Sequence, residues 1–240
     1  MPSYRVKLKH REEVAEGTMA FLFEKPIGIQ FRAGQYLNLT LIDPPETDAD
    51  GNTRTLSIAS SPLDDNLMVA TRMRDSAFKR VLKNLSIGTA VHMAGPFGSF
   101  NLHQETTRPA VFLAGGIGIT PFLSILRQAV KSQLSHRLLL FYSNRRPEDA
   151  AFLQELQQME GENKNYRFIG IMTDMKKSHR PWQGETGRID RNIVARFVED
   201  LFVPIYYMAG PPTMVSAMRG MLAGAGVNDD QLRSEEFAGY

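Results

Sequence analysis

Apolar and polar residues alternate along several short stretches of the first hundred residues. Residues 4–8 and 36–41 place apolar side chains at every second position, a spacing typical of strands that bury one face. Residues 54–60 and 67–72 are predicted as further strands, with a polar, turn-rich loop at residues 43–53. Closely spaced short strands of this kind indicate a small antiparallel barrel or sandwich.

One helix is predicted within this half of the chain. The apolar residues between Ala77 and Leu85 recur at helical spacing, and Ser76 precedes them as an N-cap. We therefore expect a helix that begins next to the strands, with its free amide groups at Ser76 and Ala77.

The pattern changes at the polar segment 103–109, where we place a boundary between domains 1–104 and 105–240. Beyond it, strands and helices alternate, and the predicted strands are residues 110–113, 138–142, 166–172 and 205–208. Such alternation predicts a doubly wound parallel sheet with helices on both faces. Sheets of this class bind ligands beyond the carboxyl ends of their strands.

Composition removes several classes of function. The 28 basic and 26 acidic residues give a net charge of +2, so no general field for nucleic acid is expected. Cysteine is absent, which excludes thiol nucleophiles and cysteine-ligated iron–sulfur clusters. The five histidines show no metal-ligand spacing, and no apolar run has the length of a membrane span or signal peptide. We expect a cytoplasmic protein without a metal site.

Two glycine turns follow predicted strands of the second half. The segment 114–121 (AGGIGITP) joins a strand to a helix, and its glycines permit close approach of a ligand to the helix start. Free amides and the helix dipole favour an anion such as pyrophosphate there. Pro121 stands where a full GxGxxG pattern would have its last glycine. The second turn, around Gly210 and Pro211, ends another strand of the same sheet.

In the first half, Arg54 supplies a fixed cation close to the predicted helix start at Ser76. A guanidinium binds phosphate oxygens with two parallel hydrogen bonds, and the helix amides offer further donors to the same anion. An ordinary solvated arginine on a strand remains the alternative.

The order of these motifs resembles the ferredoxin–NADP reductase superfamily of flavoproteins. The resemblance covers essentially the whole chain and is carried by the following segments: 54–57 (RTLS), 76–78 (SAF), 95–98 (GPFG, expected as a turn), 115–121 (GGIGITP), 209–212 (AGPP) and 234–240 (SEEFAGY). It implies an N-terminal antiparallel barrel that holds FAD and a C-terminal domain that holds NADH or NADPH.

The resemblance also implies roles for individual residues. Arg54 and the helix start at Ser76 would hold the flavin diphosphate, and Ser57 and Tyr240 would meet the reactive ring as catalytic residues. Glu235 and Glu236 are candidates for proton transfer beside the terminal tyrosine, and Glu236 is taken as the catalytic one. The residues expected to bind the cofactors are Arg54, Thr55, Leu56, Ser57, Thr71, Met73, Ser76, Ala77, Gly116, Gly118, Thr120, Pro121, Ser143, Arg145, Asp174, Gly210, Pro211 and Tyr240.

The chain departs from the family pattern at two positions. Leu56 stands where the flavin strand usually carries an aromatic residue, and Ala209 where a cysteine is frequent. The choice between nucleotides depends on the ribose 2′ position, where a phosphate is matched by arginine and a hydroxyl by a carboxylate. Arg145 favours NADPH and Asp174 favours NADH; together they lean toward NADH.

The expected function is hydride transfer from NAD(P)H to bound FAD, followed by electron transfer to a separate redox protein or small-molecule acceptor. One alternative is an NAD(P)H:flavin oxidoreductase that uses free flavin as substrate, which Leu56 makes credible. Another is a non-catalytic flavin- or nucleotide-binding subunit, which would not oxidise NAD(P)H with any acceptor.

Overall fold

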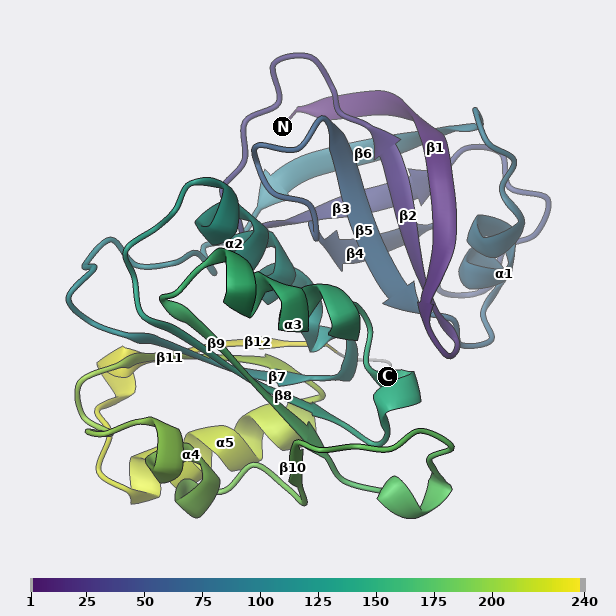
Figure 1. Cartoon of the computed structure of the whole chain (residues 1–240). Coiled ribbons are helices and arrows are strands. Elements are labelled where there is room, and N and C mark those ends of the chain that lie inside the picture. Colours follow the sequence, from purple (N-terminus) through teal and green to yellow (C-terminus); the bar gives the residue numbers. More distant parts are fainter. Residues whose placement is uncertain (1, 238–240) are drawn as a thin grey trace.

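The first half of the chain forms a closed antiparallel barrel (Figure 1). The computed structural model describes residues 2–237. The six strands run in the spatial order β4-β3-β6-β1-β2-β5, and they are β1 (Ser3–Ala15), β2 (Thr18–Glu24), β3 (Tyr36–Leu41), β4 (Thr53–Ser57), β5 (Asn66–Arg72) and β6 (Ala90–Phe97). Just after β4, Ile58 bridges Val69 of β5, and the Ala59 amide donates to the Met68 carbonyl at 2.8 Å. These contacts join the two end strands, so the predicted barrel is confirmed.

The second half forms a parallel sheet covered by helices on both faces. Its strand order is β10-β9-β8-β7-β11-β12, with β7 (Ala110–Gly115), β8 (Leu138–Asn144), β9 (Tyr166–Met172), β10 (Glu185–Thr186), β11 (Ile205–Gly210) and β12 (Leu232–Glu236). The helices are α2 (Ile119–Lys131), α3 (Leu153–Glu162), α4 (Arg191–Phe197) and α5 (Pro212–Gly224).

Alternation along the central strand β7 decides which helices cover which face. Phe112 belongs to the core that contains Phe122 of α2, whereas its neighbour Val111 belongs to the core that contains Val194 of α4 and Val215 of α5. Successive residues of a strand point to opposite faces, so one strand serves both cores. Figure 1 shows α2 and α3 on the face toward the barrel and α4 and α5 on the other. The doubly wound sheet is therefore confirmed.

Side chains cap the starts of two helices, and the first of them is the cap predicted at Ser76. The Ser76 hydroxyl accepts a hydrogen bond from the Lys79 amide at 3.3 Å at the start of α1 (Ala77–Asn84). Asp190 accepts one from the Ile193 amide at 2.8 Å at the start of α4. Each cap satisfies an amide that has no partner within its own helix.

Segment 95–98 differs from the expected turn. Gly95, Pro96 and Phe97 continue β6, because Phe97 pairs with Tyr36 of β3 and their rings lie 5.7 Å apart. Only Gly98 leaves the strand, with a φ of +90°.

Helix α2 fixes the barrel against the parallel sheet. The Ser124 hydroxyl donates to the carbonyl of Ser60 at 2.6 Å, and Arg127 donates to the carbonyl of Ala59 at 3.0 Å. Both carbonyls belong to the segment that closes the barrel. The helix that begins at the first glycine turn is therefore also the helix that positions the barrel.

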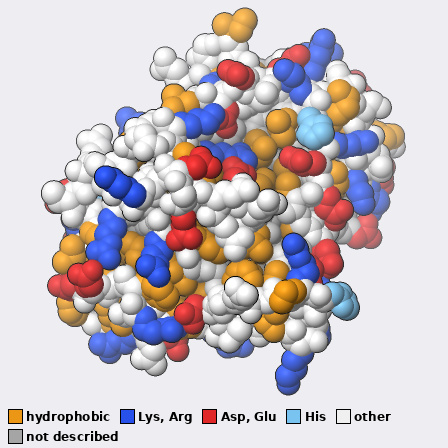
Figure 2. Space-filling view, in the orientation of Figure 1, with side chains coloured by type: hydrophobic (Ala, Val, Ile, Leu, Met, Phe, Trp, Pro, Cys, Tyr) orange, Lys and Arg blue, Asp and Glu red, His pale blue; other side chains and the backbone are white. Residues whose placement is uncertain are grey.

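The described surface carries charge of both signs. In the view of Figure 2, acidic and basic side chains are interspersed rather than separated by sign. No helix among residues 2–237 has both the length and the apolar character to cross a bilayer. Over the same residues, no group of histidine and carboxylate side chains is arranged to hold a metal ion.

Gly220 gives a first testable prediction. It lies exposed inside α5, and a Cβ at this position would meet no atom within 4 Å. Because glycine costs a helix about 1 kcal/mol relative to alanine, we expect Gly220→Ala to raise the free energy of unfolding by roughly that amount in urea titrations. The matched control is Gly17→Ala. Gly17 also has an open Cβ direction but a φ of +63°, so alanine there should destabilise the fold; stabilisation by both changes would contradict the explanation.

Candidate active site

A cavity of about 320 Å³ lies where β4 and β5 meet the start of α1. Five predicted residues line it: Arg54, Thr55, Leu56, Thr71 and Ser76. The structure adds Asp50, Arg74, Asp75, Phe78 and Lys79 to the wall. Residues up to 29 positions apart in the sequence, Asp50 and Lys79, thus meet at one site, with cationic side chains beside a helix start.

Arg54 is held rigidly at this cavity. Its Nη1 donates to the backbone carbonyls of Asp50, Gly51 and Thr53 at 2.8–3.1 Å. The guanidinium lies 5.0 Å from the centre of the Phe78 ring, within the range of a cation–π contact. Its Nη2 is buried and makes no hydrogen bond. One donor edge of the guanidinium is therefore fixed by the backbone, while the other faces the carboxylates of Asp48 and Asp50, each 3.7 Å from Nη2.

A second cavity, of about 230 Å³, lies at the carboxyl edge of the parallel sheet. The predicted residues that line it come from three turns, and they are Gly116, Gly118, Ser143, Arg145, Gly210 and Pro211. Asn144 lines it too; the side chain is buried, and neither its amide oxygen nor its amide nitrogen has a hydrogen-bond partner. The turns meet here because parallel strands end at the same edge of a sheet.

Two arginines of the barrel complete the second cavity. Arg72 ends β5 and Arg74 follows it, and both line the space beside the glycine turns. Arg74 lines the barrel cavity as well. The two cavities therefore adjoin at Arg74, a link that the sequence did not indicate because it depends on how the barrel packs against the sheet.

Several predicted residues lie outside the walls of both cavities. Ser57 is buried at the end of β4, and Met73 is half-buried against the barrel core. The Ala77 amide donates to a carboxylate oxygen of Asp48 at 2.8 Å. Tyr240 falls outside the described residues.

The same holds for three predictions in the nucleotide half. Thr120 and Pro121 are buried in the first turn of α2, and the Thr120 hydroxyl donates to the carbonyl of Ile117 at 3.0 Å. Asp174 stands 3.1 Å from the ammonium of Lys177, which balances its charge. The structure thus brings the glycine turns and Arg145 together but leaves these side chains at the edge of the site or behind it.

The carboxylate on the inner side of β12 is that of Glu235 and not that of Glu236. Glu235 pairs with Ala209 of β11, and its Oε2 is buried without a hydrogen-bond partner. Glu236 is exposed, as expected for the next residue of a strand. Burial raises the pKa of Glu235 to about 7. Of the two glutamates considered for proton transfer, Glu235 is therefore the one with a buried carboxylate oxygen and a raised pKa.

Glu235 predicts a dependence of stability on pH. Its ordinary pKa of 4.5 rises to about 7 in the folded chain, so folding favours the protonated form. Its contribution to stability is complete below pH 4.5 and is lost as the pH rises through 7. We expect Glu235→Gln to be about 1–2 kcal/mol more stable than wild type above pH 7, after allowance for partial exposure. Urea titrations from pH 4 to 9 test this; parallel profiles would contradict it, and Glu236→Gln is the control.

Comparison with known proteins finds reductases that are similar over most of the chain. Residues 112–220 match the family model of the oxidoreductase NAD-binding domain. The chain is 26% identical over 223 residues to the glycine betaine monooxygenase reductase subunit of Chromohalobacter salexigens, covering 92% of this chain and 60% of the relative. It is 26% identical over 217 residues to the reductase component of propane 2-monooxygenase of Rhodococcus jostii, covering 89% of this chain and 57% of the relative. The chain thus spans less than two thirds of the length of these relatives.

Solved structures share the arrangement of both halves. The cytochrome P450 reductase GcoB of Amycolatopsis aligns with a TM-score of 0.82 at 23% identity, over 98% of this chain and 70% of that one. A ferredoxin–NADP⁺ reductase of Neisseria gonorrhoeae with bound FAD and NADP aligns with a TM-score of 0.80 at 20% identity, over 98% of both chains. The chain therefore shares the two-domain fold of these reductases, and its second half contains the match to the NAD-binding domain family.

The polar groups of the two cavities fit the two cofactors. Nη2 of Arg54 is a charged donor that makes no hydrogen bond and lies close to a helix start, as a diphosphate requires, although the carboxylates of Asp48 and Asp50 stand 3.7 Å from it. Asn144 lies in the wall of the second cavity, where a nucleotide has ribose hydroxyls and phosphate oxygens to pair with an amide side chain. Buried polar groups that make no hydrogen bond are rare in folded proteins, so a ligand is a natural partner for Nη2 of Arg54.

Proposed function

We propose that this chain is an NAD(P)H-dependent flavoprotein reductase that takes hydride from the nucleotide onto bound FAD and passes electrons to a separate acceptor. The observation that carries the proposal is the pair of cavities that adjoin at Arg74. One has the residues for a flavin diphosphate and the other those for a dinucleotide. Ligands in both would lie side by side.

Each half of the chain has a separate task in this reaction. FAD, when bound, supplies the chemistry that connects a two-electron donor to an electron acceptor. Arg54 and the start of α1 would hold its diphosphate, while Leu56 and Thr71 form the wall beside it. The glycine turns and Arg145 would position the nucleotide, with Arg72 and Arg74 adding positive charge between the two sites.

A separate acceptor agrees with the kinds of protein that the chain resembles. The relative in Chromohalobacter salexigens is the reductase subunit of a monooxygenase, and the relative in Rhodococcus jostii is a monooxygenase reductase component. Residues 1–240 contain no cysteine to ligate an iron–sulfur cluster. An acceptor of that kind would have to lie outside these residues.

The absorbance spectrum of the purified chain tests the proposal. We expect a yellow protein that keeps its colour through gel filtration and is bleached by anaerobic NADH or NADPH. A chain that neither binds added FAD nor oxidises either nucleotide with an artificial acceptor would overturn it. A colourless chain that oxidises NAD(P)H only when free flavin is added would instead support a flavin oxidoreductase, the alternative that the aliphatic Leu56 favours.

The preference between nucleotides rests on Arg145 and Asp174. Arg145 lines the second cavity, whereas Arg146, the next residue, is occupied by ion pairs with Asp149 and Glu16. The preference for NADH that we propose depends on Asp174, which is also paired with Lys177. Comparing kcat/KM for NADH and NADPH decides the matter: a strong preference for NADPH would contradict the role of Asp174.

A further inference from the structure

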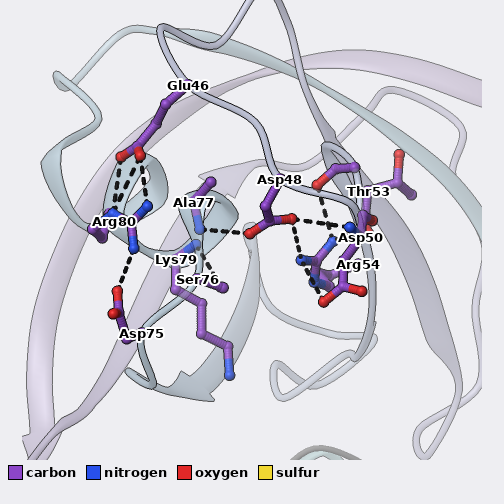
Figure 3. Close-up of polar contacts among 11 residues, drawn as sticks. Glu46, Asp48, Asp50, Thr53, Arg54, Asp75, Ser76, Ala77, Lys79 and Arg80 are labelled. Atoms are coloured by element: carbon purple, nitrogen blue, oxygen red, sulfur yellow. Dashed lines mark hydrogen bonds and ion pairs between the residues drawn. The ribbon is translucent and has the colours of Figure 1, made fainter.

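A carboxylate of the chain itself occupies the start of α1. One oxygen of Asp48 accepts the hydrogen bond of the Ala77 amide at 2.8 Å. Its other oxygen lies 3.7 Å from Nη2 of Arg54 and accepts a hydrogen bond from the Asp50 amide at 3.1 Å. Figure 3 shows Asp48 between Ala77 and Arg54, the two groups to which a phosphate of the flavin would bind.

The loop that carries Asp48 is attached to α1 at a second point. Glu46 receives hydrogen bonds from Nε and Nη2 of Arg80, the latter at 2.6 Å (Figure 3). Asp75 is a further partner of Arg80. The polar loop of residues 43–53, expected only to turn the chain, therefore lies against the first turns of α1. The carboxylates of Glu46 and Asp48 hold it there through hydrogen bonds to Arg80 and to the Ala77 amide.

Charge makes this arrangement incompatible with a bound diphosphate. Asp48 holds the amide that an anion would use, and Asp50 is a second carboxylate, 3.7 Å from Nη2 of Arg54. A phosphate at the same point would meet like charges at short range, a repulsion that is strong near a protein surface. The ligand must therefore displace the Asp48 side chain before it reaches the helix amides.

We propose that Asp48 is an internal competitor for the phosphate position of the flavin site, and that the loop of residues 43–53 must move aside when FAD binds. This inference rests on the proposed function, since it concerns the same cavity. The loop lowers affinity for flavins in proportion to their phosphate charge, so FAD is penalised most, FMN less and riboflavin not at all. Asp48 is thus a specificity-determining residue whose effect opposes that of Arg54.

Flavin titrations of the apoprotein of residues 1–240 test the inference. We expect Asp48→Asn to tighten FAD binding by at least about tenfold, because it removes one repulsive contact between a carboxylate and a phosphate. Riboflavin has no phosphate, so its binding should change less than about twofold. Asp65→Asn removes the same charge from an exposed position of the barrel and should change neither. Unchanged or weaker FAD binding would overturn the inference, as would an equal gain for riboflavin. If Asp48→Asn does not fold, Glu46→Gln takes its place: tighter FAD binding supports the inference and unchanged binding overturns it.

Inorganic pyrophosphate provides a readout that needs no flavin. It should raise the melting temperature of Asp48→Asn more than that of wild type; equal increases would overturn the inference. If neither protein binds any flavin, the proposed function fails, whereas the pyrophosphate comparison still decides whether Asp48 competes for the anion position.

Discussion

Replacing Arg54 with alanine is expected to weaken FAD binding by about a hundredfold. A charge-assisted hydrogen bond contributes roughly 1.5–3 kcal/mol, so the loss of a two-pronged contact to phosphate amounts to about 3 kcal/mol or more. The effect should be large because Arg54 is already fixed by three backbone carbonyls and by the Phe78 ring. Little side-chain entropy is then lost when the ligand binds.

Fluorescence titration of the apoprotein with FAD measures this loss. Arg54→Lys keeps the charge but not the planar fork, so we expect an intermediate decrease of about tenfold. Arg5→Ala removes an exposed cation from β1 of the same barrel and should leave the affinity unchanged. An unaltered dissociation constant for Arg54→Ala, in a protein of normal stability, would show that the flavin phosphate lies elsewhere.

The parts of the fold that were predictable are those encoded locally. Period-two alternation indicated β1 and β3, and the caps Ser76 and Asp190 each bind an amide three residues ahead in the sequence. The barrel and the doubly wound sheet follow from such local signals together with short connections between elements.

Strand β12 could not be predicted from its own sequence. Its sequence, LRSEE, has a single large apolar residue, and its place in the sheet depends on parallel pairing with β11. That register decides which of two adjacent glutamates is buried. The sequence left Glu235 and Glu236 both as candidates, and the register with Ala209 buries a carboxylate oxygen of Glu235 while Glu236 stays exposed.

Contacts between residues far apart in the sequence were also not predictable at the site. Asp48 and Ala77 are 29 residues apart, and their contact exists only because the loop folds back over α1. Likewise, Arg72 and Arg74 reach the nucleotide cavity because α2 packs on the barrel. A motif identifies the groups that can bind a phosphate, but the tertiary structure decides what competes with it.

Among glycine-to-alanine changes in the two glycine turns, Gly118→Ala is expected to cause the largest loss of stability and of nucleotide turnover. A Cβ at this position would lie 2.3 Å from the carbonyl oxygen of Ala209 and 2.6 Å from the amide nitrogen of Gly210. Both are backbone atoms, which cannot rotate away as a flexible side chain could. The turn after β7 and the turn after β11 would have to separate, although the backbone angles of Gly118 suit any residue.

We expect Gly118→Ala to lose roughly 3 kcal/mol of stability, the upper range for overpacking, and at least about tenfold in kcat/KM for the nicotinamide nucleotide. FAD affinity should change little, because the barrel cavity has no wall in these turns. Urea titration, steady-state kinetics and flavin titration measure the three quantities.

Gly116→Ala separates close approach from backbone flexibility. Gly116 lies in the same turn with a φ of +53°, and a Cβ there would meet nothing within 4 Å. Its replacement should cost only about 1–2 kcal/mol, the strain of a left-handed residue. Equal losses for the two variants would mean that the turn requires flexible glycines. A larger loss for Gly118→Ala would mean that glycine is needed at position 118 so that the two turns can approach each other closely. The distance between the two turns sets the width of the nucleotide cavity.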